Sequence, residues 1–381
     1  MSARTWDVII LGGGTMGTAA AWALSTRGAS VLVLEQFGHI HTLGSHGGGT
    51  RIFRHAYAEG PEYVPLMFHA DNLWCSLEQE LGTNIVHRVG ILEMDAPGYD
   101  HAKRARESAE KNGVEFEWLD ASEIRKRWPT FNPPDDWEGG YSPIAGFLDI
   151  EAGLSGLLAL AQRGEVTLRV NEPVLSWSSS ERGVEVVTEQ GRYQGAKLIV
   201  TAGAWAGEAL AELGLPLAVV RKQNFWIDVD QPSLFRPEVF PVFATASDVG
   251  EVYGFPIFRR AGMKMAEHRG GDETTPATVD RVARDEEAES CVDLAQLAMN
   301  GVSRRVLNGV ICMYTRTPDD HFIVDRHPTA PNVVLAAGFS GHGFKFTPAI
   351  GEQLASLALD DDAEPFGLFR IDRFATVGIG V

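Results

Sequence analysis

The sequence predicts an α/β domain of the doubly wound type and a second, α+β domain built on an antiparallel sheet. A strand, a glycine-rich turn, a helix and another strand follow one another within residues 6–35, which is the βαβ unit of a parallel sheet. Further apolar strand patterns recur at 192–205 and 332–338. Residues 221–268 instead alternate apolar and polar positions, as the strands of a half-buried antiparallel sheet do.

The opening unit begins with the apolar run WDVIIL at 6–11, whose β-branched residues favour a strand. The glycines of GGGTMG then turn the chain, and the run TAAAWALSTRG predicts a helix that ends at Gly28. SVLVLE at 30–35 is a second buried-strand pattern and ends in an acid.

The segments between these strands predict further elements. Residues 38–55, rich in glycine and histidine, predict a long loop, and helical patterns cover 63–82 and 100–112. Residues 272–298 are acidic and become helical at their end. The run TPAIGEQLASLAL predicts a last helix over 347–359, with Thr347 as its N-cap and Pro348 at its first position.

The length also requires two domains, because 381 residues exceed what one hydrophobic core normally holds. Strands of the first type lie at the start, middle and end of the chain, so that domain is predicted to be discontinuous. It is expected to comprise residues 1–80, 146–219 and 319–381, and the second domain residues 81–145 and 220–318.

The composition disfavours several kinds of partner. Asp plus Glu is 51 and Lys plus Arg 33, a net charge of −18, which argues against nucleic acid or an anionic membrane as partner. No apolar run approaches the ~20 residues of a membrane span, and the N-terminus lacks a signal-peptide pattern. The cysteines Cys75, Cys291 and Cys312 make neither a disulfide framework nor a zinc site. We expect a cytoplasmic protein.

Gly12, Gly14 and Gly17 form the pattern G-x-G-x-x-G between the first strand and the first helix. The first glycine permits the tight turn, the second lets the backbone approach a pyrophosphate, and the third lets the helix lie close to the strand. Glu35 ends the second strand, where an acid can bind ribose hydroxyls. The motif does not separate FAD from NAD, but the acid disfavours NADP. The alternative is a plain glycine turn with a solvated glutamate.

Five further stretches carry a more specific signal. They are GSHGGGTRIFRHAYAEGPEYVPL, YGFP, MKMAEH, CMYTRTPDDHFIVD and AAGFSGHGFKF, in this order along the chain. Together they resemble monomeric sarcosine oxidase and N-methyltryptophan oxidase, a family of FAD-dependent amine oxidases. The resemblance implies a Rossmann-type FAD-binding domain with a D-amino-acid-oxidase-like substrate domain. It also implies a monomer that uses O2 to oxidise N-methyl amino acids, which are secondary amines, and releases formaldehyde and hydrogen peroxide. The substrate is expected to be sarcosine or a bulkier N-methyl amino acid.

The resemblance assigns the flavin contacts. Cys312 matches the family cysteine whose sulfur is joined to the 8α carbon of FAD, whereas the other two cysteines are expected to be inert. A glycine-rich loop before the last helix can stabilise the charge that develops on reduced flavin. The cofactor-binding residues expected from the motif and the resemblance are Gly12, Gly14, Thr15, Met16, Gly17, Glu35, Ser45, Thr50, Arg51, Val174, Cys312, Met313, Gly341, His342, Gly343, Phe344 and Lys345.

The resemblance also assigns the substrate pocket. Arg54 and Lys345 match the pair that holds the substrate carboxylate, a task suited to the forked guanidinium. Lys264 matches the lysine that activates O2, because a fixed cation stabilises superoxide. Arg51 matches an arginine beside the flavin face. The remaining residues matched to the pocket are His268, Tyr253 and Tyr314.

Two departures from the family pattern bear on these assignments. The loop reads Ser45-His46-Gly47-Gly48-Gly49-Thr50-Arg51 where the family has a second histidine and an acid. Ala244 stands where the sarcosine enzyme has a bulky methionine, which suggests room for a larger side chain. The alternatives are therefore an oxidase of N-methyltryptophan, of pipecolate or proline, or of a glycated amino acid. A flavin-binding protein without turnover is the alternative from another class.

Overall fold

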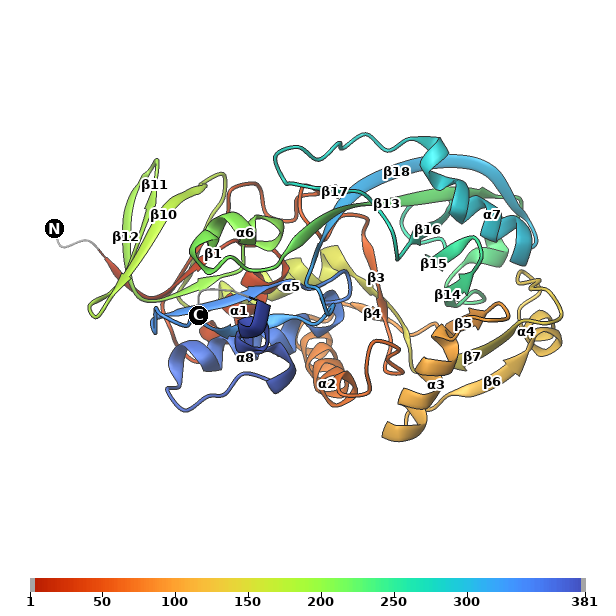
Figure 1. Cartoon of the computed structure of the whole chain (residues 1–381), viewed down its shortest axis with the longest axis horizontal. Helices are drawn as coiled ribbons and strands as arrows, with labels where there is room; N and C mark the ends of the chain where they lie inside the picture. The colour runs from red at the N-terminus through yellow and green to blue at the C-terminus, as the bar shows by residue number, and fades with distance from the viewer. Residues whose placement is uncertain (1–3, 378–381) are drawn as a thin grey trace.

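The computed structural model describes residues 4–377 and consists of two lobes side by side along the long axis of the molecule (Figure 1). One lobe contains both chain termini and a largely parallel sheet. The other contains a large mixed sheet. No helix in the described part of the chain is long and apolar enough to cross a membrane.

The first lobe is built on a sheet whose central strands run parallel in the order β9-β2-β1-β12-β20. An antiparallel ribbon, β10-β11, extends from one half of β12, and β19 pairs antiparallel with β20. The strands are β1 (Thr5–Leu11), β2 (Val31–Leu34), β9 (Val166–Arg169), β10 (Val174–Ser180), β11 (Gly183–Thr188), β12 (Gly191–Val200), β19 (Ile323–Arg326) and β20 (Val333–Ala337).

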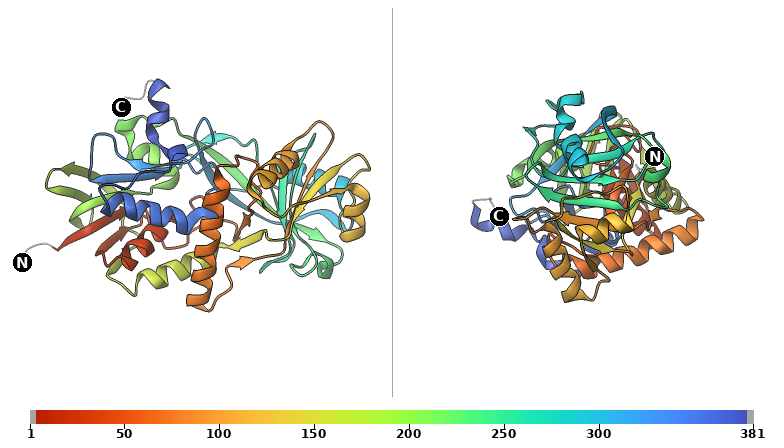
Figure 2. Two further views of the ribbon diagram at one scale, coloured as in Figure 1. Left: turned by 90° about the horizontal axis from the view of Figure 1, so that it is seen from below. Right: turned by 90° about the vertical axis from the view of Figure 1, so that its right-hand side faces the viewer.

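Helices cover one face of this sheet (Figure 2, left). Helix α1 (Thr15–Thr26) packs between α5 (Ile150–Ala161) and α8 (Thr347–Leu359), and α2 (Tyr63–Leu81) packs against α8. Small residues on both helices permit the close packing of α1 and α8, since a β-carbon at Gly351 of α8 would lie 2.6 Å from the carbonyl oxygen of Ala19 in α1. The predicted helix 347–359 is confirmed, but its N-cap is Phe346. Thr347 is the first helical residue instead, and its hydroxyl donates back to Phe344.

The second lobe confirms the antiparallel sheet predicted for 221–268. Its order is β17-β13-β16-β15-β14-β5-β7-β6. Strand β18 pairs with the whole length of β13, whereas β17 and β16 each pair with part of it. Among the described strands of this sheet, β5 and β14 form the parallel pair. The strands are β5 (Ile91–Asp95), β6 (Glu117–Asp120), β7 (Glu138–Ser142), β13 (Ala218–Val229), β14 (Val242–Ser247), β15 (Gly250–Phe255), β16 (Met263–Glu267), β17 (Glu273–Thr274) and β18 (Val302–Arg316). Helices α3 (His101–Asn112), α4 (Ala121–Arg127) and α7 (Glu289–Ala298) pack against it.

A small sheet corrects one prediction. Residues 38–55 are not loop throughout, because β3 (Thr50–Phe53) pairs with β8 (Gly146–Asp149), which also pairs with β4 (Val86–His87). This sheet contains strands from both predicted domains, whose boundaries stay a prediction. The other short elements are α6 (Ala206–Ala209) and 3-10 turns at Gly203–Trp205, Ala211–Leu213, Pro232–Phe235, Asp285–Ala288, Phe344–Phe346, Gly367–Phe369 and Ile371–Val377.

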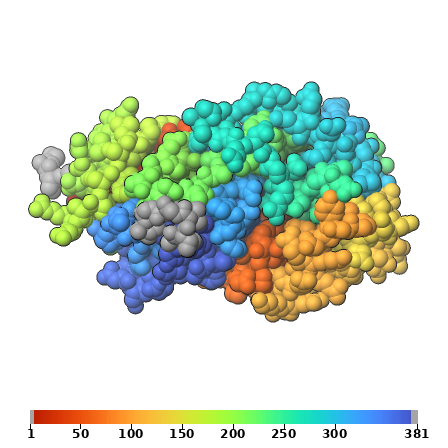
Figure 3. Space-filling model, in the orientation of Figure 1, coloured from red at the N-terminus to blue at the C-terminus, as the bar shows by residue number. Residues whose placement is uncertain are grey.

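The segment 270–288 connects the two lobes at the surface. It runs from the mixed sheet toward the first lobe, in teal in Figures 1 and 3. There the guanidinium of Arg281 donates to the carbonyl oxygen of Leu43 at 3.0 Å. Beside this contact Arg221, buried in β13, donates to the carbonyl oxygen of Asp280 at 2.7 Å, and it also pairs with Glu287, near the end of the segment, at 2.6 Å. The segment is therefore tied to both lobes.

Candidate active site

A cavity of about 790 Å³ extends through the first lobe from the glycine-rich turn to the interface with the second lobe. Its volume lies within the range of roughly 300–1,000 Å³ that is usual for ligand sites. Strand ends and the loops that follow them line it, as expected for an open α/β sheet. The lining includes 11–12, 14–16, 34–36, 173–177, 201–205, 313–315 and 338–341.

The three motif glycines have distinct geometries. Gly12 has φ +96°, and a β-carbon there would lie 2.5 Å from the carbonyl oxygen of Thr201. Gly17 lies against the same turn, since a β-carbon would come within 1.9 Å of Gly12. Gly14 precedes α1 and has no atom of the described chain within 4 Å of its β-carbon position. The backbone at the N-terminus of α1 is therefore open to the cavity, where its N–H groups favour an anion.

Glu35 follows β2 and is buried against the turn. One carboxylate oxygen accepts from the N–H of Gly13 at 2.9 Å and the other from that of Phe37 at 2.8 Å. These bonds hold the carboxylate of Glu35 at the cavity wall, next to the glycine-rich turn. An elongated cavity with an open helix N-terminus and an acid beside it fits FAD.

The other end of the cavity is formed by β18 and the loop before α8. Gly341 has φ +82°, and a β-carbon there would lie 2.2 Å from the ring of Tyr314. Only glycine fits this position, because the loop is pressed against the tyrosine ring. A second cavity, of about 60 Å³, shares Tyr314, Gly341 and Phe344 with the first. The two cavities therefore meet at this loop.

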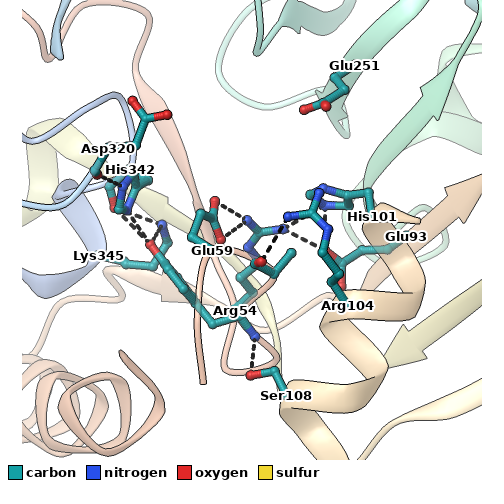
Figure 4. A network of polar contacts seen from close by, with 12 residues as sticks. Arg54, Glu59, Glu93, His101, Arg104, Ser108, Glu251, Asp320, His342 and Lys345 are labelled. Atoms are coloured by element: carbon teal, nitrogen blue, oxygen red, sulfur yellow. Dashed lines mark hydrogen bonds and ion pairs between the residues drawn. The ribbon is translucent and has the colours of Figure 1, made fainter. Parts of the chain in front are cut away.

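Buried charges surround the second cavity (Figure 4). Nη2 of Arg54 donates to both oxygens of Glu59 at 2.6 and 2.8 Å. Nη1 lies 2.6 Å from Glu93 and 3.1 Å from Nε2 of His101. Burial opposes the charge of Arg54, but Glu59 and Glu93 outweigh it, and the pKa of the guanidinium is raised. The pKa of Glu59 is held well below its usual range by Arg54, against the effect of burial.

Lys345 enters the cavity from the loop before α8. Its Nζ donates to the carbonyl oxygen of His342 at 2.9 Å and to the hydroxyl of Tyr57 at 3.3 Å. Burial, aided by the charge of Arg54, lowers the pKa of Lys345 to about 7. The amine is therefore poised between its charged and neutral forms near neutral pH.

Two tyrosines and a histidine form the wall toward the mixed sheet. The hydroxyls of Tyr253 and Tyr314 lie 3.4 Å apart. Burial raises the pKa of both phenols and holds the pKa of His268 well below its usual value. At neutral pH these groups are uncharged, so the positive charges at the pocket are those of arginine and lysine.

Cys312 and Lys264 lie together on the same face of the mixed sheet, beneath the loop 47–49. The amide Nδ2 of Asn224 donates to Sγ of Cys312 at 3.4 Å. Nζ of Lys264 donates to the backbone and side-chain oxygens of Thr50 at 3.0 and 3.2 Å. Burial, with the charge of Arg51, lowers the pKa of Lys264 well below its usual value. Cys312 lies within β18, which runs on to Arg316.

The structure brings most of the sequence-predicted residues to these two cavities. The first is lined by Gly12, Gly14, Thr15, Met16, Glu35, Ser45, Val174, Met313, Gly341, Gly343 and Phe344. The second is lined by Arg51, Arg54, Ala244, Tyr253, His268, Tyr314, Gly341, His342, Phe344 and Lys345. Gly17, Thr50, Lys264 and Cys312 lie behind the walls of the cavities.

Sequence reasoning missed several polar residues at the site. Glu59, Glu93, His101 and Glu251 contact the pocket or its arginine, and Asn224 contacts the cysteine. Glu251 faces the cavity from β15 (Figure 4) and pairs with Arg269 at 3.1 Å. A signal was available for one of them, since Glu93 interrupts the otherwise apolar run 91–94.

Comparison with known proteins decides the family. The family described as FAD dependent oxidoreductase (DAO) matches residues 7–357. The chain belongs to this family. The predicted fold and the predicted flavin-dependent amine oxidase class are confirmed by this match together with the relatives below.

Curated family members are similar over nearly the whole chain. A monomeric sarcosine oxidase of Streptomyces avermitilis is 39% identical over 97% of this chain and 98% of its own length. One from an Arthrobacter species is 35% identical over 97% of each. An N-methyl-L-tryptophan oxidase of Yersinia pestis is 33% identical over 97% of this chain and 99% of its own. The resemblance seen in the sequence is confirmed.

Solved structures of the family share the fold. NikD, an amino acid oxidase of nikkomycin biosynthesis, superposes with a TM-score of 0.86 at 24% identity, covering 97% of this chain and 98% of NikD. Glycine oxidase from Geobacillus kaustophilus has a TM-score of 0.79 at 19% identity, covering 97% of this chain and 99% of its own.

Proposed function

We propose that this family member catalyses the FAD-dependent oxidative demethylation of a small N-methyl amino acid. Sarcosine is the simplest candidate. O2 is the electron acceptor, and the products are the demethylated amino acid, formaldehyde and hydrogen peroxide. The observation that carries the proposal is the pair of buried cations, Arg54 and Lys345, at the point where the substrate-sized cavity meets the FAD-sized one.

Arg54 and Lys345 are proposed to hold the substrate carboxylate. Nε of Arg54 is buried without a hydrogen-bond partner among residues 4–377, and the adjacent Nη2 is held by Glu59. A carboxylate that replaces Glu59 would engage Nε and Nη2 together, which is the bidentate edge of a guanidinium. Glu93 and His101 would meanwhile keep Nη1 in place.

The substrate amine must be neutral to lose a hydride equivalent. Arg51, Arg54 and Lys345 surround the cavity, and positive charges favour the unprotonated amine. No side chain then has to act as a general base. Bound FAD would accept the hydride and pass its electrons to O2. The residues would bind and orient the substrate, and Tyr253, Tyr314 and His268 would line its path as neutral groups.

Lys264 is proposed to assist the oxygen step. The burial that lowers its pKa favours a neutral amine, but formation of superoxide beside it favours the protonated form. Lys264 would then become positively charged as negative charge forms on the oxygen. Arg51 is proposed to tune the same face of the flavin, since its guanidinium spans the loop carbonyls of Ser45 and Gly47 at 2.7 and 2.8 Å.

FAD is proposed to be bound covalently through Sγ of Cys312. The cysteine is buried and lies next to Met313, which lines the larger cavity. Three consecutive glycines, 47–49, separate Sγ from the cavity, and such a segment rearranges at low cost. We further propose a monomer located in the cytoplasm.

The size of the second cavity bears on the choice of substrate. Ala244 lines it, as expected, but a volume of about 60 Å³ favours a small side chain. N-methyltryptophan, pipecolate, proline or a glycated amino acid would each require the pocket to widen. A flavin-binding protein without turnover is disfavoured because it would have no use for a second cavity lined by Arg54 and Lys345 beside the larger one.

The experiment that tests this proposal is peroxide release from the purified yellow protein over a panel of amines at fixed O2. The panel contains sarcosine, N-methylalanine, N-methyltryptophan, proline, pipecolate and glycine. Peroxide from sarcosine and N-methylalanine, with little from glycine, supports the proposal. If N-methyltryptophan alone or the cyclic amines alone give peroxide, the chain is still an oxidase but its substrate class differs from the one proposed. No peroxide with any of them would reject the reaction.

A further inference from the structure

Asn224 is a buried amide on the strand opposite Cys312. The β13–β18 register pairs Lys222 with Cys312 and Asn224 with Val310, so these four side chains share one face. Nδ2 of Asn224 reaches diagonally across and donates to Sγ at 3.4 Å. An N–H···S contact of this length is a normal hydrogen bond to sulfur. Asn224 therefore fixes the position of the sulfur from the side.

The other end of this amide lacks a partner. Oδ1 of Asn224 accepts no hydrogen bond from the described chain, although the side chain is only 2% exposed. A polar group of this kind in a native core requires an explanation. Lys222, two residues earlier on the same face of β13, is also buried and polar, but its Nζ donates to the backbone oxygens of Arg269 and Gly270. The side chain of Asn224 instead donates its hydrogen bond to the cysteine.

The glycine loop above the sulfur packs closely against the amide of Asn224. A β-carbon at Gly48 would lie 3.3 Å from Nζ of Lys264 and 3.4 Å from Cγ of Asn224, and φ there is +91°. At Gly47 a β-carbon would lie 3.8 Å from Cβ of Cys312. The loop directly over Sγ of Cys312 therefore carries no side chains. Asn224 supplies the side chain that donates a hydrogen bond to this sulfur.

Covalent attachment of FAD requires a thiolate. One S–C bond forms at the 8α carbon, and one proton leaves the thiol and another the 8α methyl group. The electron pair left behind reduces the ring by two electrons, and O2 removes that pair as hydrogen peroxide. A hydrogen bond donated to sulfur is stronger when the sulfur is negatively charged. The contact from Asn224 therefore favours the nucleophilic form.

On this basis we infer that Asn224 is a positioning residue for the self-catalysed attachment of FAD to Cys312. It orients Sγ toward the cofactor and stabilises the thiolate through Nδ2. The inference rests on the proposed covalent linkage and adds a residue to it. Other ionisable groups also face the sulfur, namely Lys222 on β13, Tyr314 on β18, Lys264 on β16 and Tyr253 on β15. Burial is the largest influence on the pKa of each group. A negative charge on the sulfur of Cys312 raises all four pKa values.

The test measures attachment and not turnover. Full-length protein is produced under riboflavin limitation and given FAD in air at several pH values. Acid-stable flavin fluorescence is then followed with time in wild type, Asn224→Leu and Asn224→Asp. We expect attachment at pH 7 to be at least tenfold slower in both variants. In Asn224→Asp the midpoint of the pH profile should move to higher pH, because the carboxylate repels the thiolate.

Gln223→Leu is the matched control, since Gln223 neighbours Asn224 on β13 but points to the opposite face. FAD released by acid from freshly mixed protein shows that each variant still binds the cofactor. Wild-type rates and an unshifted pH profile in both Asn224 variants would overturn the inference. Equal slowing in Gln223→Leu would overturn it as well, because the effect would then be structural.

The same experiments distinguish failure of the proposed function from failure of the proposed role of Asn224. If wild type never forms acid-stable flavin, the covalent linkage and the role of Asn224 are both wrong, while peroxide release with noncovalent FAD still tests the oxidase. If wild type attaches FAD and Asn224 variants do so more slowly, the inference stands even when no amine in the panel is oxidised.

Discussion

The carboxylate of Glu93 lies 2.6 Å from Nη1 of Arg54, and both side chains are buried. Glu59 occupies the other end of the same guanidinium. Arg54 thus faces two carboxylates before any substrate binds. A substrate carboxylate can replace the partly exposed Glu59, but Glu93 is fully buried on β5 and remains as a like charge nearby. Glu93 should therefore limit the affinity of the pocket for anions.

Replacing Glu93 by Gln keeps the shape and an acceptor for Arg54 but removes the charge. We expect the variant to bind a carboxylate more tightly by about 1–2 kcal/mol. This is the repulsion between Glu93 and the bound carboxylate over about 6 Å, at an effective dielectric constant of about 20 and with partial screening. The dissociation constant of acetate, followed by flavin absorbance, measures this. Glu110→Gln on the exposed face of α3 is the control. Weaker binding in Glu93→Gln would show that its charge is needed to hold Arg54.

Lys345 should make carboxylate binding dependent on pH. Its pKa is lowered to about 7, so it is protonated below that value and neutral above it. A bound carboxylate favours the protonated form, so affinity should be greatest below pH 7 and fall by up to tenfold per unit above it. Titration with acetate from pH 6 to 9 measures this. In Lys345→Met the decline should disappear, and its persistence would assign it to another group.

Lys264→Met should separate the two half-reactions. Flavin reoxidation by O2 is expected to slow by roughly 10²–10³-fold, the usual loss when one electrostatic stabiliser is removed, while reduction by substrate changes little. Stopped-flow absorbance measures both steps, and Lys103→Met, at an exposed position, is the control. Equal slowing of the two steps would contradict the assignment.

Gly341→Ala should reduce flavin binding. The added methyl group would lie 2.2 Å from the ring of Tyr314, at a backbone φ of +82° that alanine rarely adopts. The loop must move, and the wall that both cavities share moves with it. The ratio of flavin to protein after purification measures the loss. Gly207→Ala, where no atom lies within 4 Å of the new carbon, should bind flavin normally.

The sequence was sufficient to predict features that depend on local patterns. The motif at 12–17 and the alternation at 221–268 each predict one kind of structure, and the structure contains both. Of the residues matched through the family resemblance, Arg54 and Lys345 line the smaller cavity and Cys312 lies behind the cavity walls, and their roles stay predictions. The motif and the alternation predict structure because each is a regular pattern of neighbouring residues that constrains the local backbone.

Long-range pairings were not predictable in the same way. Glu93 and Arg54 are 39 residues apart and meet where the small sheet and the mixed sheet adjoin, whereas Asn224 and Cys312 are 88 apart and meet through the β13–β18 register. The strand at Thr50–Phe53 was missed because its partner, β8, lies almost a hundred residues later. The N-cap of α8 was misplaced because Thr347 bonds backward to Phe344 instead of forward.

The proposed oxidation of a small N-methyl amino acid by the chain's own flavin can be followed in a single turnover without O2. The purified protein is mixed with sarcosine, and the flavin absorbance is recorded. Bleaching of the flavin with one formaldehyde and one glycine formed per flavin is the predicted result. Flavin that stays oxidised with sarcosine and with N-methylalanine would contradict the proposed reaction.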